Sequence, residues 1–189
     1  MNNMKILIID NNDSFTNNLM HLFAKEISSV EILSKSCDHI LSQDFQSSEL
    51  NGYDLLIISP GPGCPADYPG YEAVIKSGKP VLGVCLGMQI INEYCGGKTS
   101  RLKGCFHGRT EKISFAGLQL NVARYHSLFC SEIGDGLEVI SENNEGIPMA
   151  VSHGSLPLLG YQFHPESFLT EQSGVFIKYA FDFFKFSKF

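Results

Sequence analysis

Short apolar runs that alternate with segments of helical pattern limit the possible folds of this chain more than any other feature. Residues 5–9, 54–59 and 80–84 are dominated by aliphatic side chains. Strands that are apolar on both faces are typical of parallel sheets with helices on each side. Helical spacing of apolar residues follows at about 14–25 and 88–95. We therefore predict an α/β fold with a doubly wound, mostly parallel sheet flanked by helices.

The second half of the chain combines a small antiparallel region with a return to the main sheet. Short strands separated by turns are expected at residues 111–115, 119–123, 137–141 and 148–153. Residues 158–163 are apolar enough to rejoin the central sheet, and a last helix is expected from about 172 to 186. A chain of 189 residues with no visible repeat or long linker is expected to form one domain over residues 1–189.

The composition argues against several classes of partner. The net charge is −6 and the Lys and Arg residues form no stripe, which disfavours nucleic acid. No apolar run reaches the ~18 residues of a membrane span, and the N-terminus lacks the pattern of a signal peptide. The six cysteines include no C-x-x-C pair. We therefore expect reduced thiols in a cytoplasmic protein, without a disulfide framework or a metal site.

The motif Gly-Val-Cys-Leu-Gly at residues 83–87 stands between a predicted strand and a predicted helix. Glycines on both sides allow a sharp turn that lifts the side chain of Cys85 into a cleft, and the start of the following helix favours a thiolate. A buried structural thiol is the alternative for a cysteine in such a motif. The nucleophile reading depends on a base elsewhere in the chain.

Such a base stands far downstream, in the segment Gln-Phe-His-Pro-Glu-Ser at residues 162–167. Pro165 keeps His164 extended, and residues two apart in an extended segment point to the same side. His164 can thus take the thiol proton while Glu166 holds the imidazole in orientation. We predict a triad of Cys85, His164 and Glu166.

Attack on a carbonyl also requires donors for the oxygen that becomes negative. The backbone N–H of Leu86, at the start of the helix after the cysteine, is the first candidate. Gly61 is the second, because it follows the predicted strand 54–59 in a Pro-Gly-Pro-Gly loop and glycine permits close approach of the backbone. Leu86 and Gly61 are therefore the predicted oxyanion hole.

Five segments in order, at residues 10–19, 59–63, 83–89, 124–128 and 162–167, together resemble the class I, triad-type glutamine amidotransferases. The similarity runs from residue 5 to about 174 and is greatest to the small subunits of anthranilate synthase and aminodeoxychorismate (para-aminobenzoate) synthase. The resemblance implies hydrolysis of L-glutamine by the same triad, without a cofactor in this subunit, and the same two oxyanion donors. The residues that it implies for holding the glutamine are Gly61, Pro62, Gly63, Gln89, Ser127 and Leu128.

The resemblance also implies a partner. Ammonia would pass to a larger chorismate-binding synthase subunit, in a heterodimer or heterotetramer. The chain departs from the family pattern at Met88, where histidine is usual. We expect this change to alter local packing and to leave the mechanism intact. Two alternatives are a stand-alone cysteine hydrolase of the same fold, acting on γ-glutamyl compounds, and a non-catalytic scaffold subunit.

Overall fold

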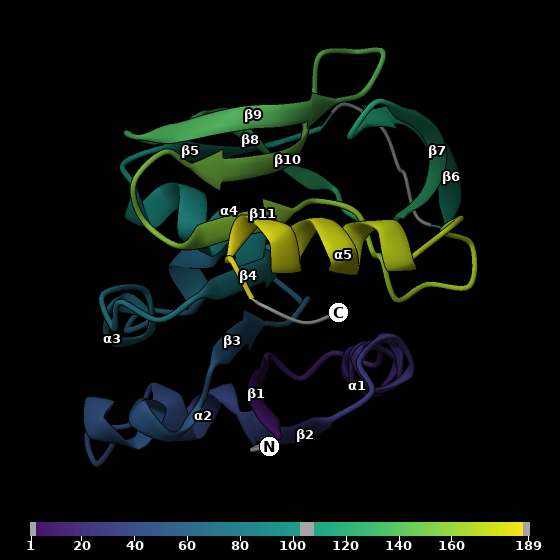
Figure 1. Cartoon of the computed structure of the whole chain (residues 1–189). Coiled ribbons are helices and arrows are strands. Elements are labelled where there is room, and N and C mark those ends of the chain that lie inside the picture. Colours follow the sequence, from purple (N-terminus) through teal and green to yellow (C-terminus); the bar gives the residue numbers. More distant parts are fainter. Residues whose placement is uncertain (1–2, 103–107, 187–189) are drawn as a thin grey trace.

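The computed structural model of the chain describes residues 3–102 and 108–186. Within these residues the central sheet has seven strands in the order β2-β1-β3-β4-β11-β10-β9 (Figure 1). The first five strands in this order are parallel neighbours, and β10 and β9 continue the sheet in antiparallel pairing. The strands are β1 (Met4–Asp10), β2 (Val30–Ser36), β3 (Leu55–Ile58), β4 (Val81–Val84), β9 (Leu137–Glu142), β10 (Pro148–His153) and β11 (Leu158–Tyr161).

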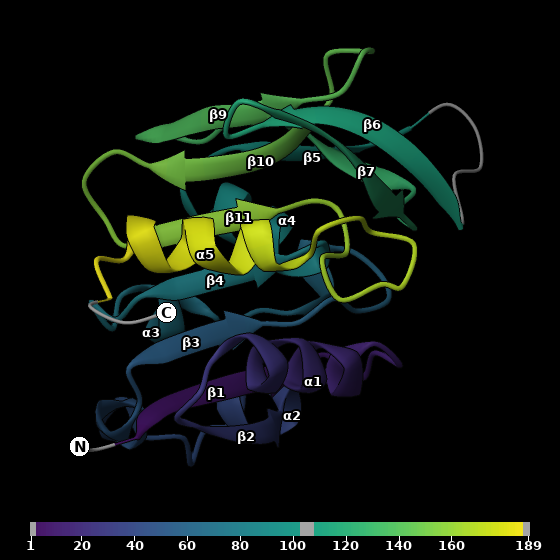
Figure 2. The ribbon, with the colours of Figure 1, turned by 45° about the vertical axis from the view of Figure 1, so that its right-hand side comes forward.

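Helices cover both faces of this sheet, as predicted (Figure 2). One face packs against α1 (Thr16–Glu26) and α5 (Gly174–Phe183), and the other packs against α2 (Cys37–Ile40), α3 (Glu72–Ile75) and α4 (Leu86–Tyr94). In β1, Ile6 and Ile8 belong to the first core while Leu7 and Ile9 belong to the second. This alternation explains why the parallel strands are apolar at every position. Short 3-10 turns, η1 (Ser47–Gly52) and η2 (Pro65–Asp67), connect the elements around β3.

Two antiparallel ribbons lie beside the main sheet. The ribbon of β6 (Arg109–Phe115) and β7 (Leu118–Arg124) was predicted from the sequence, whereas β5 (Lys98–Arg101) and β8 (Leu128–Glu132) were not. Residues 98–101 are Lys-Thr-Ser-Arg, none of them fully buried, so β5 has no apolar pattern to mark it as a strand. Backbone pairing with β8 defines it instead.

Two expected element ends differ from the structure. The helix expected from about residue 14 begins at Thr16, where Phe15 is the N-cap and no side chain caps the helix. The Asp13 carboxylate accepts the N–H of Phe15 at 2.8 Å, one step before the helix, as aspartate does in a tight turn. The predicted strand 158–163 ends at Tyr161, because the N–H of His164 donates to the carbonyl of Ala123 in β7.

No helix within the described ranges has the length and apolarity needed to cross a bilayer. Cys105, one of the six cysteines, lies outside the described residues.

Candidate active site

Cys85 occupies a sharp turn between β4 and α4. Its backbone has φ 53° and ψ −102°, a conformation that side-chain-bearing residues rarely adopt. The turn is tight because a Cβ on Gly83 would lie 2.4 Å from the backbone of Gly87. The N–H of Cys85 donates to the carbonyl of Tyr161 in β11 at 2.7 Å, which ties the turn to the neighbouring strand. The predicted strand–turn–helix geometry is therefore present.

The segment after β11 brings His164 and Glu166 together in a buried position. Nδ1 of His164 lies 2.7 Å from Oε1 of Glu166, and the His164 side chain is 3% exposed. Rings of Phe15 and Tyr125 pack on the imidazole with centroid separations of 5.4 and 5.0 Å. With Nδ1 bound to Glu166, Nε2 is the nitrogen available to Cys85. Nε2 is buried and has no hydrogen-bond partner among the described residues.

The charges around His164 favour its protonated form. Burial alone lowers the pKa of an imidazole, but attraction to Cys85 and Glu166 outweighs this and raises the pKa of His164 well above its usual range. An imidazolium between a sulfur and a carboxylate is the arrangement that a thiolate nucleophile requires.

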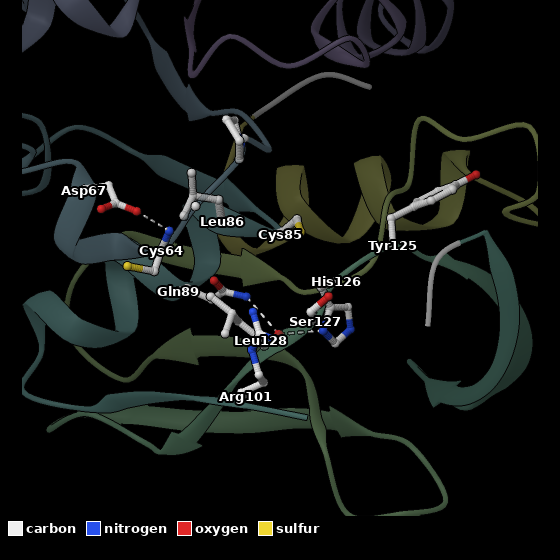
Figure 3. Close-up of a pocket in the computed structure, with 13 residues that line it drawn as sticks. Cys64, Asp67, Cys85, Leu86, Gln89, Arg101, Tyr125, His126, Ser127 and Leu128 are labelled. Atoms are coloured by element: carbon white, nitrogen blue, oxygen red, sulfur yellow. Dashed lines mark hydrogen bonds between the residues drawn. The ribbon is translucent and has the colours of Figure 1, made fainter. Parts of the chain in front are cut away.

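A cavity of about 490 Å³ opens in front of Cys85 (Figure 3). A volume of this order suits a small-molecule ligand. The predicted site residues that line it are Gly61, Pro62, Gly63, Cys85, Leu86, Gln89, Ser127 and Leu128. The structure thus brings the predicted glutamine-holding residues together around the nucleophile. Their roles toward a substrate remain predictions.

A second cavity of about 420 Å³ reaches Cys85 from the side of α1. Phe15, Tyr125 and His164 line it together with residues 12–14. His164 lines this cavity together with Cys85, whereas Gln89, Ser127 and Leu128 line the first. Cys85 therefore lies between two openings, one toward the predicted substrate pocket and one toward the predicted base.

The loop after β3 places Gly61 directly against the start of α4. A Cβ on Gly61 would lie 2.6 Å from Cβ of Asn11 and 2.8 Å from Cδ2 of Leu86, so only glycine fits. Asn11 is fully buried and is fixed by two hydrogen bonds to Ser59, of 2.9 Å each, and by the hydroxyl of Tyr71. Leu86 is the first residue of α4, where backbone N–H groups lack partners within the helix. The geometry is compatible with the predicted oxyanion pair.

Several residues of the cavity were not assigned to the site from the sequence. Asp67 and Arg101, of opposite charge, both line the first cavity, as do Cys64, Tyr125 and His126. Arg101 ends β5, a strand that the sequence pattern did not indicate. Asp67 binds the N–H of Cys64 at 2.8 Å, and this backbone hydrogen bond lowers the pKa of its carboxyl. Cys64 stands in the Pro-Gly loop, and Tyr125 and His126 belong to segment 124–128 of the family resemblance, so these three had a signal in the sequence, whereas Asp67 and Arg101 had none.

Comparisons with known proteins agree with this geometry. Residues 7–184 match the family model described as glutamine amidotransferase class-I. Anthranilate synthase component 2 of Helicobacter pylori is 38% identical, over 89% of this chain and 92% of that protein. Aminodeoxychorismate synthase of Streptomyces griseus is 37% identical, over 89% of this chain and 24% of that protein. A solved glutamine amidotransferase of Thermotoga maritima has the same fold, with a TM-score of 0.69 at 18% identity, covering 88% of this chain and 77% of that one. The chain belongs to the class-I glutamine amidotransferase family.

Proposed function

We propose that this chain is the glutaminase subunit of a chorismate-aminating synthase. It hydrolyses L-glutamine and passes the ammonia to a larger chorismate-binding partner, in an anthranilate or aminodeoxychorismate synthase. The observation that carries the proposal is the arrangement of Cys85 with the His164–Glu166 pair at a cavity of ligand size. A relative of similar length, anthranilate synthase component 2 of Helicobacter pylori, is named as one component of a synthase, and this supports the existence of a partner subunit.

In the first half of the reaction, the thiolate of Cys85 attacks the side-chain amide carbon of glutamine and forms a carbon–sulfur bond. The N–H groups of Gly61 and Leu86 donate to the carbonyl oxygen as it becomes negative. The imidazolium of His164 then gives its proton to the amide nitrogen. The carbon–nitrogen bond breaks, and ammonia leaves a γ-glutamyl thioester on Cys85.

In the second half, His164 is neutral and can take a proton from water. The resulting hydroxide attacks the thioester carbon, glutamate leaves, and the thiolate of Cys85 is restored beside the imidazolium. Glu166 holds the imidazole by the 2.7 Å bond to Nδ1 throughout, so that Nε2 serves both steps. A thiol, an imidazole, a carboxylate and water supply all of this chemistry, and we propose that the subunit works in the cytoplasm without a cofactor.

Dependence on the partner tests the proposal directly. The isolated chain is expected to release ammonia from glutamine slowly, and addition of the chorismate-binding subunit is expected to raise the rate by at least about tenfold, because the partner completes the site by induced fit. Coupled measurement of ammonia with and without that subunit checks this. Rapid turnover of γ-glutamyl peptides by the isolated chain would instead favour the stand-alone hydrolase.

The two charged residues of the cavity suit an α-amino acid. Glutamine carries an ammonium and a carboxylate on one carbon, and Asp67 and Arg101 offer the opposite charges. We expect the Arg101→Gln variant to raise KM for glutamine about fivefold with kcat little changed, since a solvent-exposed ion pair contributes about 1 kcal/mol at most. Steady-state kinetics of the complex measure this. Lys112→Gln on β6, away from the cavity, is the matched control, and an unchanged KM for Arg101→Gln would contradict the assignment.

A further inference from the structure

Gln162 contacts the nucleophile but has no part in the mechanism described so far. It follows β11 directly and is fully buried. Its side-chain nitrogen Nε2 lies 3.8 Å from Sγ of Cys85, within hydrogen-bonding range for sulfur. A buried amide donor beside a reacting sulfur can stabilise the anionic form of that sulfur.

The direction of the amide is fixed by a neighbouring backbone carbonyl. Nε2 of Gln89 lies 3.1 Å from the carbonyl oxygen of Leu128 and 3.1 Å from Oε1 of Gln162. A carbonyl can only accept, so the NH₂ end of Gln89 must face Leu128. Its second hydrogen then points to Gln162, which must present its oxygen. The NH₂ end of Gln162 is therefore the end that faces Cys85.

The same carbonyl also orients a histidine. Nδ1 of His126 lies 2.6 Å from the carbonyl oxygen of Leu128, so that nitrogen carries a hydrogen. Gln89, Leu128 and His126 all line the first cavity, whereas Gln162 does not. Because both hydrogens of Gln89 Nε2 are used, its Oε1 is the atom with which it can bind an N–H of the substrate.

We propose that Gln162 is a catalytic residue that donates a hydrogen bond to the thiolate of Cys85, and that Gln89 is the positioning residue that turns its amide. The proposal rests on the function proposed above. In the resting enzyme the thiolate is held from two sides, by the imidazolium of His164 and by the amide of Gln162. During thioester formation the sulfur loses its charge and Gln162 keeps both protons. Gln162 therefore stabilises the thiolate of Cys85 in the resting enzyme, and again in the second half of the reaction, when the thiolate is the leaving group.

Alkylation of Cys85 by iodoacetamide between pH 5 and 9, followed by peptide mass spectrometry, tests this without glutamine. Gln162→Met keeps an unbranched side chain and removes the donor. On the acidic limb of the profile its alkylation rate is expected to fall about tenfold, the value of a hydrogen bond to a charged group, and to match the wild type at high pH where every thiol is ionised. Gln89→Leu is expected to give a smaller decrease. Gln119→Met, an exposed position on β7, is the matched control and is expected to leave the profile unchanged.

The outcomes separate this proposal from the proposed function. A folded Gln162→Met variant with the wild-type alkylation profile would overturn the role of Gln162. A shifted profile in a protein that never releases ammonia from glutamine would support the contact and refute the function.

If Gln162→Met does not fold, a pH titration of the side-chain amide resonances of the wild type by NMR tests the contact instead. The Gln162 amide protons are expected to shift as Cys85 ionises and not to shift in Cys85→Ala; a shift that is the same in both would overturn the proposal.

Discussion

The Cys85→Ala variant is expected to lose ammonia release from glutamine by about 10⁶-fold, because no other group can form the covalent thioester and losses of this size follow removal of a triad nucleophile. Alanine retains the Cβ, so the unusual φ of 53° at this position is no more strained than in the wild type. The melting temperature is expected to stay within a few degrees. Ammonia assays of the complex together with thermal unfolding measure both quantities.

The same substitution at the far end of α4 is the control. Cys95 follows that helix as its C-cap and lines neither of the two cavities that reach Cys85. Cys95→Ala is expected to leave the rate of ammonia release unchanged. Unchanged ammonia release by a complex that carries Cys85→Ala would show that Cys85 is not the nucleophile, as the non-catalytic scaffold alternative requires.

The Gly83→Ala variant is expected to have the largest effect on stability. The new Cβ would lie 2.4 Å from the backbone carbon and oxygen of Gly87 and 2.6 Å from the nitrogen of Met88, so the helix itself would have to move. Overpacking of this kind lowers the free energy of unfolding by about 3 kcal/mol. In a chain of this size, that loss lowers Tm by about 10 °C. Movement of the turn displaces Cys85, so kcat is expected to fall about 100-fold as well.

Gly52→Ala is the matched control for this variant, because nothing lies within 4 Å of the position its Cβ would take. Its free energy of unfolding is expected to change by about 0.5 kcal/mol or less. Denaturant unfolding of both variants and the wild type provides the comparison. Equal stability of Gly83→Ala and Gly52→Ala would mean that the turn at residues 83–87 tolerates a side chain and that its packing does not hold Cys85 in place.

The parts of the site that could be predicted are those encoded in short segments. The sharp turn around Cys85 and the pair His164–Glu166 each depend on a few neighbouring residues at the end of a strand. Apolar runs marked those strands clearly, so the central sheet and its two helical faces were also predictable. The parallel alignment of β4 with β11 then brings these segments to one edge of the sheet.

The remaining features depend on contacts between distant segments. Arg101 reaches the cavity only because the polar strand β5 pairs with β8, and neither strand has a pattern that identifies it. The direction of the Gln162 amide follows from Gln89 and from a backbone carbonyl at Leu128, which no side-chain motif records. The end of β11 at Tyr161 is likewise set by pairing of His164 with Ala123.

The contact between Met88 and Gly160 affects how the nucleophile and the base are held relative to each other. A Cβ on Gly160 would lie 2.7 Å from Cγ of Met88, so α4 rests on β11 with only a hydrogen atom and a thioether chain between them. Helix α4 begins at the residue after Cys85, and β11 leads to His164. This close packing, together with the hydrogen bond from the Cys85 N–H to the carbonyl of Tyr161, holds the nucleophile next to the strand that leads to the base. A bulkier side chain at the buried position 88 would consequently push α4 away from β11 and shift the nucleophile relative to the base, without changing the chemistry of either group.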